Sequence, residues 1–443
     1  MAGKVDPARL VAYDVLRAVH AQDAYANLAL PALLRERSVT GRDAALATEL
    51  VGGTLRGLGT YDAVLAAVVD RPPDDEVRDA LRLGVHQLLA TRVPSHAAVA
   101  TTVDLVRRRV GHRPSGFVNA VLRKVGAHDL DGWLRRVAPD PDADPVGHAA
   151  VVHSHPRWVV ERLAEALGER GDELDALLAA DNDRPAVTLV ARPGLSDVAE
   201  LPGTPSISPL GVVLEGGDPG EVAAVREGRA GVQDAGSQLV ALALARTEVE
   251  GPDRAWLDLC AGPGGKAALL GALASQCGAR LVAAERQPHR ARLVARAVGT
   301  TAGVVTADGA RPPWAAGRFD RVLVDAPCTG LGALRRRPEA RWRRTPDDLS
   351  ALVPLQRALL ESALDSTRPG GVVAYATCSP VVEETAGVVR EVLAGRDDVD
   401  LADAVPLVPE AVDAAGVHLP GTVQLWPHRH GTDAMFLAVL RRL

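Results

Sequence analysis

Residues Ala255–Lys266 read AWLDLCAGPGGK and predict the first strand, turn and helix of an α/β sheet. The apolar run around Asp258 is typical of a buried strand, and the run after Lys266 is typical of a helix. Three glycines and a proline, Gly262–Gly265, form the turn, and glycine lets a ligand approach the backbone closely. Doubly wound sheets bind ligands beyond the carboxyl ends of their strands. We therefore expect this turn to be the floor of a cofactor site.

The chain after this turn alternates strands and helices, which is the pattern of a mostly parallel sheet covered on both faces. The predicted strands are Ala255–Leu259, Arg280–Ala284, Gly303–Thr306, Arg321–Val324 and Val372–Ala376, with Ala434–Leu440 as a last strand at the sheet edge. The predicted helices cover residues 264–275, 288–298, 349–366 and 381–394.

Two further parts precede the sheet. Apolar side chains recur at helical spacing through residues 1 to about 126, which predicts an all-helical domain with a binding role. The proline- and aspartate-rich stretch Ala138–Gly147 predicts a linker. Short apolar runs at Val187–Val190 and Gly211–Leu214 predict strands of a small α+β module. The expected domains are 1–137 (helical), 138–149 (linker), 150–230 (α+β module) and 231–443 (sheet domain).

Composition excludes several classes of protein. The 443 residues exceed one ordinary core, no apolar run approaches the roughly 18 residues of a membrane span, and the N-terminus lacks a signal-peptide core. We therefore expect a multidomain cytoplasmic protein. Its four cysteines form no CxxC pair, which argues against a metal site and against a disulfide framework. The net charge of −6 does not suggest a nucleic-acid binder, and arginine runs such as Arg107–Arg109 are commonly a solvated helix face.

Acidic residues stand at the ends of four predicted strands. They are Asp258, Glu285, Asp308 and Asp325. An acid that ends the second strand suits hydrogen bonds to ribose hydroxyls, and Asp308 is placed to meet an adenine edge. The alternative is that these acids cap the helices that follow them.

The glycine turn alone leaves more than one ligand open. Residues Gly262–Ala267 fit the pattern G-x-G-x-x-A, so a dinucleotide-dependent oxidoreductase is an alternative. A phosphate-binding P-loop fits less well, because it requires glycine where Cys260 stands and serine or threonine where Ala267 stands.

Two cysteines favour a different chemistry. Cys328 follows the fourth predicted strand in DAPC, and Cys378 follows the fifth in ATCSP. Neighbouring strands lie about 4.8 Å apart, so adjacent fourth and fifth strands would turn both thiols into one pocket. A thiolate that adds to carbon 6 of a pyrimidine makes carbon 5 nucleophilic, and a base must later remove the carbon 5 proton. Asp325 is placed to hydrogen-bond the ring nitrogen, and Lys266 can supply positive charge.

The motifs DLCAGPGGK (258–266), DAPCTGLGALRRRPEARW (325–342) and YATCSP (375–380) together resemble the Sun/Fmu family of RNA cytosine-5 methyltransferases. The helical N-terminus, with FVNAVLRK at 117–124, resembles the NusB-like domain of the RsmB subgroup. This resemblance implies a NusB-like RNA-binding domain, a small RNA-binding module and a Rossmann-like class I methyltransferase domain with a mostly parallel seven-stranded sheet. It also implies S-adenosylmethionine as the methyl donor and a cytosine of 16S ribosomal RNA as the substrate. The RNA would be free or an early small-subunit precursor, and we expect a monomer.

The resemblance also assigns roles to residues. Cys378 corresponds to the nucleophile that forms a covalent adduct, Cys328 to the thiol that helps release the product, and Asp325 to the active-site acid. Glu285 takes the ribose contact, although aspartate is commoner there, and Asp308 takes the adenine end. The donor's methionine and ribose part is held by Cys260, Ala261, Gly262, Pro263, Gly264, Gly265 and Lys266. The RNA contacts expected from the arginine cluster are Arg335, Arg336, Arg337, Arg341 and Trp342. The residues by themselves leave the roles of the two cysteines open.

Overall fold

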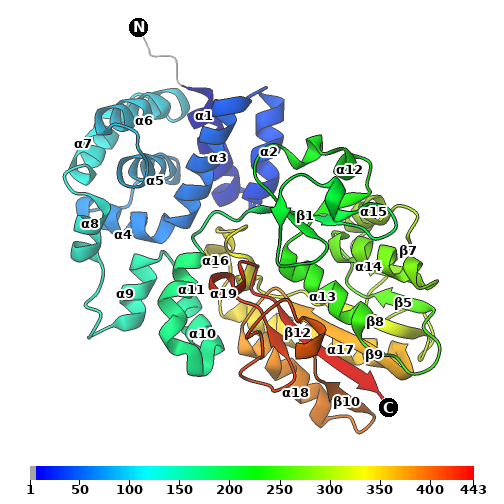
Figure 1. Cartoon of the computed structure of the whole chain (residues 1–443). Coiled ribbons are helices and arrows are strands. Elements are labelled where there is room, and N and C mark those ends of the chain that lie inside the picture. Colours follow the sequence, from blue (N-terminus) through cyan, green and yellow to red (C-terminus); the bar gives the residue numbers. More distant parts are fainter. Residues whose placement is uncertain (1–5) are drawn as a thin grey trace. The chain divides into compact units, whose positions relative to one another are not determined.

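A computed structural model describes residues 6–443 and separates the chain into two compact units (Figure 1). Unit 1 contains the described residues up to Glu161 together with two later segments, Leu178–Arg184 and Leu334–Arg343. Unit 2 contains Arg162–Leu177, Pro185–Ala333 and Arg344–Leu443. This division differs from the predicted boundaries at 137, 149 and 230, which remain a proposal about independently folding parts. Within residues 6–443, every helix is too short or too polar to cross a membrane.

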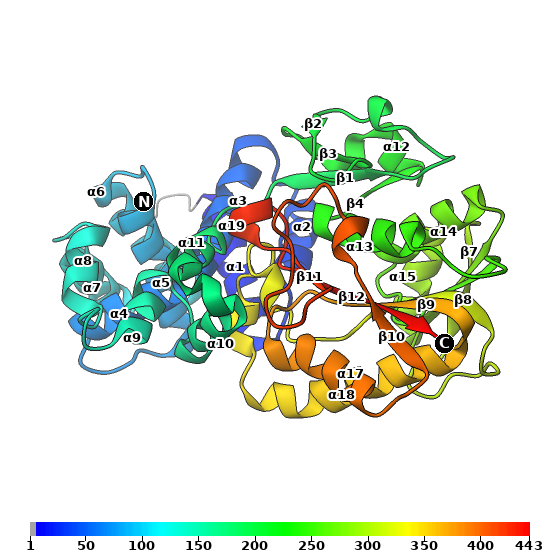
Figure 2. The ribbon, with the colours of Figure 1, turned by 60° about the horizontal axis from the view of Figure 1, so that its bottom comes forward.

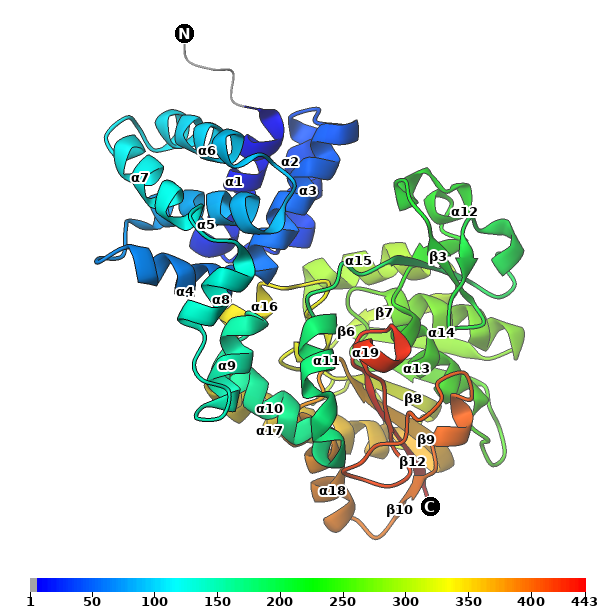
Figure 3. The same cartoon turned by 60° about the vertical axis from the view of Figure 1, so that its left-hand side comes forward.

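Unit 1 is helical, as predicted, and packs around one central helix, α5 (Asp75–Ala90). Helix α5 contacts α1, α3, α4, α6 and α7, and every residue from Asp79 to Gln87 is buried (Figure 3). A helix surrounded in this way carries buried residues on all its faces. The other helices of the N-terminal segment are α1 (Pro7–Ala21), α2 (Ala26–Glu36), α3 (Gly41–Arg56), α4 (Leu58–Val68), α6 (Ser95–Arg109), α7 (Ser115–Val125), α8 (Leu130–Val137) and α9 (Pro145–Val152).

The stretch that predicted a linker contains the start of α9. Asp144 is the N-cap of this helix, and its carboxylate accepts a hydrogen bond from the Gly147 amide at 3.0 Å. Proline follows at the first helical position, where its missing N–H costs no hydrogen bond. The Asp-Pro composition therefore marks a helix start rather than a flexible spacer at this point.

Two helices connect the units along the chain, and a small sheet follows them within unit 2. Helices α10 (Arg157–Leu167) and α11 (Leu174–Ala180) each contribute residues to both units. The small sheet has the order β2-β3-β1-β4 and is antiparallel throughout. Its strands are β1 (Val187–Ala191), β2 (Thr204–Pro205), β3 (Gly211–Leu214) and β4 (Ala230–Val232), accompanied by the short helix α12 (Ala223–Arg226). The two predicted strands correspond to β1 and β3.

The main sheet of unit 2 has the order β10-β12-β9-β8-β5-β6-β7, with β11 paired to β12. Strands β5 to β9 pair in parallel, and β12 is antiparallel to β9 and β10. The strands are β5 (Ala255–Asp258), β6 (Arg280–Glu285), β7 (Ala302–Thr306), β8 (Phe319–Asp325), β9 (Thr367–Thr377), β10 (Val399–Ala402), β11 (Val423–Gln424) and β12 (Phe436–Arg442). The prediction of a last strand at the sheet edge is wrong, because β10, which the sequence analysis missed, pairs with the outer side of β12.

Helices cover both faces of this sheet (Figure 2). On one face Trp256 and Leu281 pack with helices α13 and α14, and on the other Leu257 and Val322 pack with α17 and α18. Successive residues of a strand point to opposite faces of the sheet. Since helices cover both faces, the side chains on both faces are buried and apolar. The helices are α13 (Ala235–Arg246), α14 (Gly265–Gln276), α15 (Pro288–Val298), α17 (Asp347–Ser366), α18 (Ala386–Ala394) and the short α19 (Pro427–His430).

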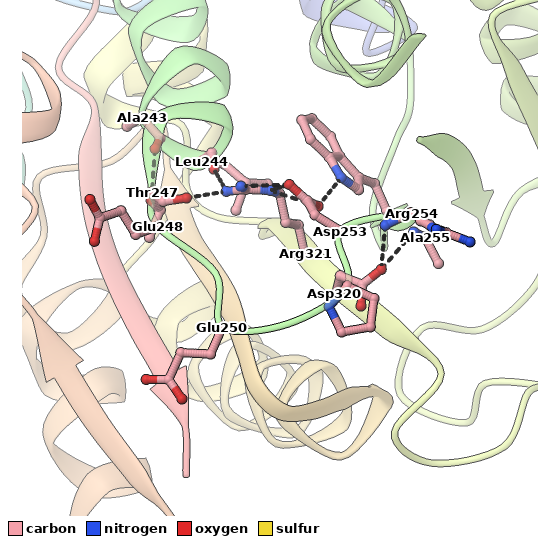
Figure 4. A network of polar contacts seen from close by, with 12 residues as sticks. Ala243, Leu244, Thr247, Glu248, Glu250, Asp253, Arg254, Ala255, Asp320 and Arg321 are labelled. Atoms are coloured by element: carbon pink, nitrogen blue, oxygen red, sulfur yellow. Dashed lines mark hydrogen bonds and ion pairs between the residues drawn. The ribbon is translucent and has the colours of Figure 1, made fainter. Parts of the chain in front are cut away.

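A polar network anchors the amino ends of β5 and β8 (Figure 4). The Arg321 guanidinium binds the Asp253 carboxylate at 2.8 Å and donates to the Leu244 carbonyl at 2.6 Å, near the end of α13. Asp320 accepts hydrogen bonds from the Arg254 and Ala255 amides at 2.7 Å each. A cation at a helix C-terminus is favourable because the carbonyls there carry partial negative charge. The network fixes the strands at the end opposite the candidate site.

Candidate functional site

The predicted acidic residues meet at the carboxyl edge of the main sheet. Asp258, Glu285 and Asp325 are the last residues of β5, β6 and β8, and Asp308 lies two residues beyond β7. Strand β5 pairs with both β6 and β8, so these side chains belong to neighbouring strands of one edge. The edge and the turns that follow its strands up to Ala333 belong to unit 2, as do the turn and helices after β9.

The glycine turn is tight enough to require glycine at two positions. Gly264 has a φ of +115°, and a Cβ added there would lie 2.6 Å from the Cβ of Ala297. A Cβ on Gly262 would lie 1.9 Å from Oε2 of Glu285. Side chains at these positions would therefore strain the backbone or displace the Glu285 carboxylate. The turn leaves backbone, rather than side chains, facing the strand ends.

Two carboxylates beside this turn have hydrogen-bonding capacity for a ligand. Asp258 is fully buried, accepts a hydrogen bond from the Cys260 amide at 3.3 Å, and its Oδ2 has no partner among the described residues. Burial, reinforced by the nearby Asp325, raises the pKa of Asp258 to about 8. Glu285 accepts from the Gln287 amide at 2.8 Å through Oε1, and Oε2 lies 3.6 Å from Nε of Arg290. A buried polar atom without a partner is costly, which favours a ligand there.

The remaining predicted cofactor residue, Asp308, lies at the rim. Its Oδ1 accepts a hydrogen bond from the Ala310 amide at 3.1 Å, and 40% of its side chain is exposed. Arg290 was not predicted, yet it donates a hydrogen bond to the Gly262 carbonyl at 2.8 Å. The glycine turn, the orphaned oxygen of Asp258 and the acid on β6 thus place backbone and carboxylate groups around one site at this edge of the sheet.

The two cysteines of the strand-end motifs lie side by side. Cys328 follows β8 and Cys378 follows β9, and these strands pair in parallel, as predicted, with Asp325 opposite Ala376. The two Sγ atoms are 3.5 Å apart, within hydrogen-bond distance for sulfur. The Gly332 amide donates to the Cys378 carbonyl at 2.9 Å, which ties the segment after Cys328 to the second cysteine.

The contact between the sulfurs makes them chemically unequal. The hydrogen bond from Cys328 lowers the pKa of Cys378, and the positive charge of Lys266 acts in the same direction against burial and Asp325. The same hydrogen bond, together with burial, raises the pKa of Cys328. A thiolate is the nucleophilic form of cysteine. The surroundings of Cys378 therefore favour its thiolate form more than those of Cys328 do.

Lys266 and Asp325 form an ion pair next to the cysteines. The Lys266 Nζ lies 2.9 Å from Oδ2 of Asp325. Burial by itself would lower the pKa of Lys266, but the Asp325 charge and hydrogen bond outweigh burial and raise it. The lysine thus stays charged beside a partly exposed carboxylate.

Sequence analysis missed a buried acid behind the cysteines, Glu384. Its carboxylate accepts hydrogen bonds from Thr329, which follows Cys328, and from Gln356 of α17. Its position six residues after Cys378 matches no spacing rule that would single it out. The pairing of Glu384 with a residue 55 positions earlier is a tertiary contact.

The structure corrects part of the predicted RNA surface. Arg341 is fully buried in unit 1, where its guanidinium donates to Asn182 Oδ1 at 2.8 Å and to the Ser154 carbonyl at 3.0 Å. Arg335 is only 7% exposed, and Trp342 packs against the helical core. In this structure these three side chains hold the segment Leu334–Arg343 in unit 1 instead of facing solvent.

Other side chains of this segment form hydrogen bonds with the ends of two helices of unit 1. The Glu339 carboxylate accepts a hydrogen bond from the Ala26 amide at the start of α2, and Arg343 donates to the Val19 carbonyl near the end of α1. These charges complement the helix dipoles. Arg337 remains exposed, with its guanidinium 5.6 Å from the centre of the Tyr25 ring, which is itself 45% exposed. Arg336, the remaining predicted contact, is partly exposed.

Comparisons with known proteins agree over both halves of the chain. The pattern of the family described as "16S rRNA methyltransferase RsmB/F" matches residues 242–441, and that of the NusB family matches residues 6–127. Rv1407 of Mycobacterium tuberculosis is 55% identical over 99% of this chain and 97% of its own length. The "Probable ribosomal RNA small subunit methyltransferase B" of Bacillus subtilis is 30% identical over 98% of each chain.

Solved structures share the fold. The crystal structure of PH0851 superposes with a TM-score of 0.81 at 23% identity and covers 99% of both chains. A methyltransferase homolog protein from Pyrococcus horikoshii superposes with a TM-score of 0.53 at 21% identity, over 67% of this chain and 98% of that one.

Among residues 6–443, no group of three or more histidine, cysteine or acidic side chains is arranged to hold a metal ion.

Proposed function

Because the chain belongs to the RsmB/F family of S-adenosylmethionine-dependent methyltransferases, we propose that it methylates carbon 5 of a cytosine in 16S ribosomal RNA. The observation that carries this proposal is the pair of sulfurs 3.5 Å apart, with the Lys266–Asp325 ion pair beside them. Two thiols in contact serve a reaction that needs a nucleophile in one step and a proton acceptor in a later one. The names of relatives that act on ribosomal RNA support the substrate.

The first step uses Cys378. Its thiolate sulfur bonds to carbon 6 of cytosine, and the electron pair of the carbon 5–carbon 6 double bond shifts to carbon 5 and is delocalised through carbon 4 onto the ring nitrogen, which makes carbon 5 nucleophilic. The ring nitrogen next to carbon 4 takes up a proton from water as the adduct forms, the Asp325 carboxylate accepts a hydrogen bond from that N–H, and the Lys266 charge stabilises the electron-rich adduct. The target base must be unpaired or turned out of its stack to reach the sulfur.

When bound, S-adenosylmethionine supplies a methyl group on a positively charged sulfur. Carbon 5 bonds to that methyl carbon, and the electron pair of the broken bond stays on the donor's sulfur. Cys378, now a thioether, no longer carries the negative charge that helped keep the proton on Cys328. Cys328 can then release its proton to water and, as a thiolate, accept the proton of carbon 5. Loss of that proton restores the double bond and expels Cys378 as a thiolate.

The residues that would hold the donor are those of the glycine turn, Cys260–Lys266, with Glu285 at the ribose hydroxyls and Asp308 at the adenine. Glu285 suits this role because its Oε2 accepts no hydrogen bond at normal distance from the residues described and lies against Gly262. The orphaned Oδ2 of Asp258 is the second point where a donor group of the ligand would be satisfied.

The proposed function is tested by methyl transfer from labelled S-adenosylmethionine to unmethylated 16S ribosomal RNA, followed by digestion to nucleosides. We expect the label in 5-methylcytosine. Binding of the donor without labelling of any RNA would refute the proposed substrate. Calorimetry separates the dinucleotide alternative, since an oxidoreductase would bind NAD and ignore S-adenosylmethionine.

We propose that Arg337 and Tyr25 contribute to RNA binding by unit 1. Both are exposed, and a guanidinium beside an aromatic ring can bind phosphate while the ring stacks on a base. Replacing Arg337 by alanine is expected to weaken RNA binding several-fold and to reduce the slope of log K against log salt by about 0.7 to 0.9. Filter binding at several salt concentrations measures both.

The matched control for this test is Arg280→Ala, which removes one exposed arginine from the start of β6 in unit 2, at the end of the main sheet opposite the candidate site. An Arg337→Ala variant with the affinity and salt slope of wild type would contradict the proposed RNA contact. Equal losses of RNA affinity in both variants would indicate a general effect of net charge instead.

A further inference from the structure

The carboxylate of Glu384 is a fully buried acceptor behind the two cysteines. Glu384 ends the short helix at Val382–Glu384, and its Oε1 accepts from the Thr329 amide at 2.8 Å and from Gln356 Nε2 at 3.0 Å. Its Oε2 accepts from the Thr329 hydroxyl at 2.5 Å. That distance is typical of a hydroxyl bound to an ionised carboxylate. All three contacts are donated to Glu384, so they stabilise its negative charge.

The same contacts hold the turns that carry both sulfurs. Thr329 directly follows Cys328, and its Oγ1 lies 3.0 Å from the Oγ of Ser379, which directly follows Cys378. Because the Thr329 hydroxyl donates to Glu384, the Ser379 hydroxyl is left to donate to Thr329. Gln356 also donates to the carbonyl of Pro327 at 2.8 Å, on the other side of Cys328. Removing the carboxylate would therefore loosen the Cys328 turn at two points.

We propose that Glu384 is a positioning residue that keeps the two cysteine turns in register and retains the proton on Cys328, which leaves Cys378 as the attacking sulfur. This inference rests on the proposed function, because it assigns the order in which the two thiols act. It supplies a physical reason for an assignment that the residues of the two motifs leave open.

The charges around the two sulfurs support this order. The negative charge of Glu384 raises the pKa of Cys328, in addition to the hydrogen bond with Cys378 and burial. Around Cys378, Lys266 lowers the pKa while Asp325 and Asp433 raise it. Tyr375 also packs here and donates its hydroxyl to the Glu384 carbonyl at 2.7 Å. Glu384 thus opposes ionisation of Cys328, whereas Lys266 favours ionisation of Cys378. A thiolate with a raised pKa is also the stronger proton acceptor, as the release step requires.

The test is the order in which the two thiols react. Wild type, Glu384→Gln and the control Glu383→Gln are alkylated with iodoacetamide across a pH series, and each cysteine is quantified by peptide mass spectrometry. We expect Cys378 to react before Cys328 in wild type. In Glu384→Gln the ratio of Cys378 to Cys328 labelling should fall by about tenfold, the equivalent of one pKa unit. Glu383 pairs with Arg162 and is partly exposed, so its variant should keep the wild-type ratio.

The second readout is covalent capture of RNA that contains 5-fluorocytosine, whose carbon 5 cannot lose a proton. Thr329→Val removes the hydroxyl contact but keeps the Glu384 charge, so it should retain the alkylation order while the adduct yield falls several-fold. The electrostatic role of Glu384 is overturned if the ratio of Cys378 to Cys328 labelling in Glu384→Gln lies within twofold of wild type or equals that in Glu383→Gln. If Glu384→Gln does not fold, the Thr329→Val variant tests the positioning role. A covalent adduct yield of Thr329→Val within twofold of wild type overturns that role.

These two readouts separate the inference from the proposed function. Alkylation needs neither RNA nor methyl donor. If wild type captures no RNA but Glu384→Gln reverses the alkylation order, the proposed substrate fails and the role of Glu384 stands. If wild type captures RNA and Glu384→Gln changes neither readout, the proposed function stands and the role of Glu384 fails.

Discussion

Replacing Cys378 by alanine is expected to lower methyl transfer to RNA by about 10⁴-fold or more, as removal of a catalytic nucleophile does. Replacing Cys328 by alanine is expected to give a different defect, a covalent RNA–protein adduct that accumulates. The two sulfurs are only 3.5 Å apart, and under the proposed mechanism they act on neighbouring carbons of one base, Cys378 on carbon 6 and Cys328 on the proton of carbon 5. Loss of the Cys328 proton acceptor leaves the methylated base attached to Cys378.

Labelled methyl transfer and denaturing gel electrophoresis of the RNA–protein adduct measure the two effects on the same samples. Cys277→Ala is the matched control, because Cys277 is exposed at the end of α14 and should be replaceable without loss of either signal. An adduct that appears with Cys378→Ala instead would exchange the roles of the two cysteines. Full activity of both alanine variants would exclude covalent catalysis by this pair.

Replacing Arg341 by methionine is expected to destabilise unit 1 by about 3 kcal/mol, because three buried acceptors lose their donor. These acceptors are the carbonyls of Ser154 and Asp181 and the side-chain oxygen of Asn182. Burial lowers the pKa of Arg341 to about 10, so part of this cost is offset when the buried charge is removed. Methionine keeps most of the volume, so the change reports on the polar contacts rather than on a cavity.

Thermal unfolding measures the loss, and hydrogen exchange followed by mass spectrometry locates it in residues 153–155 and 178–184. The control is Arg344→Met, three residues later, which removes a partly exposed ion pair with Asp348 and a hydrogen bond to the Thr329 carbonyl at 3.2 Å, together about 1 kcal/mol. Equal stability of the two variants would mean that Arg341 does not hold its segment in unit 1.

The geometry of the main sheet's carboxyl edge was predictable because its signals are local. The run before Asp258 and the glycine turn define a strand and its exit within about a dozen residues, and the structure places β5 and α14 there. Parallel strands end at one edge, so acids at strand ends had to gather. The contact between Cys328 and Cys378 followed from a single further assumption, that β8 and β9 are neighbours, which their pairing confirms.

The position of the last strand could not be obtained in the same way. The apolar alternation of β12 is equally compatible with an edge and an inner strand, because both bury apolar side chains on the sheet faces. Strand β10 is short and pairs with β12 between Val399 and Ala402, where polar and apolar residues alternate only over Asp398–Leu401, the shortest run that indicates a strand. Strand β10 forms by backbone pairing with the outer side of β12, a contact between distant parts of the chain.

The alternating α/β half, the helical first part and the set of residues that meet at the carboxyl edge could be predicted, because they depend on periodicity and on neighbours in the chain. The environment of each charge became known only from the folded structure. Arg341 was predicted to face RNA, yet its partners lie between 159 and 187 positions away and bury it. Glu384 carries no motif, yet its partners Gln356 and Thr329 lie 28 and 55 positions earlier and place its charge behind one of two sulfurs. The solvation and pairing of a charged group are properties of its surroundings in space, and these surroundings exist only once the chain is folded.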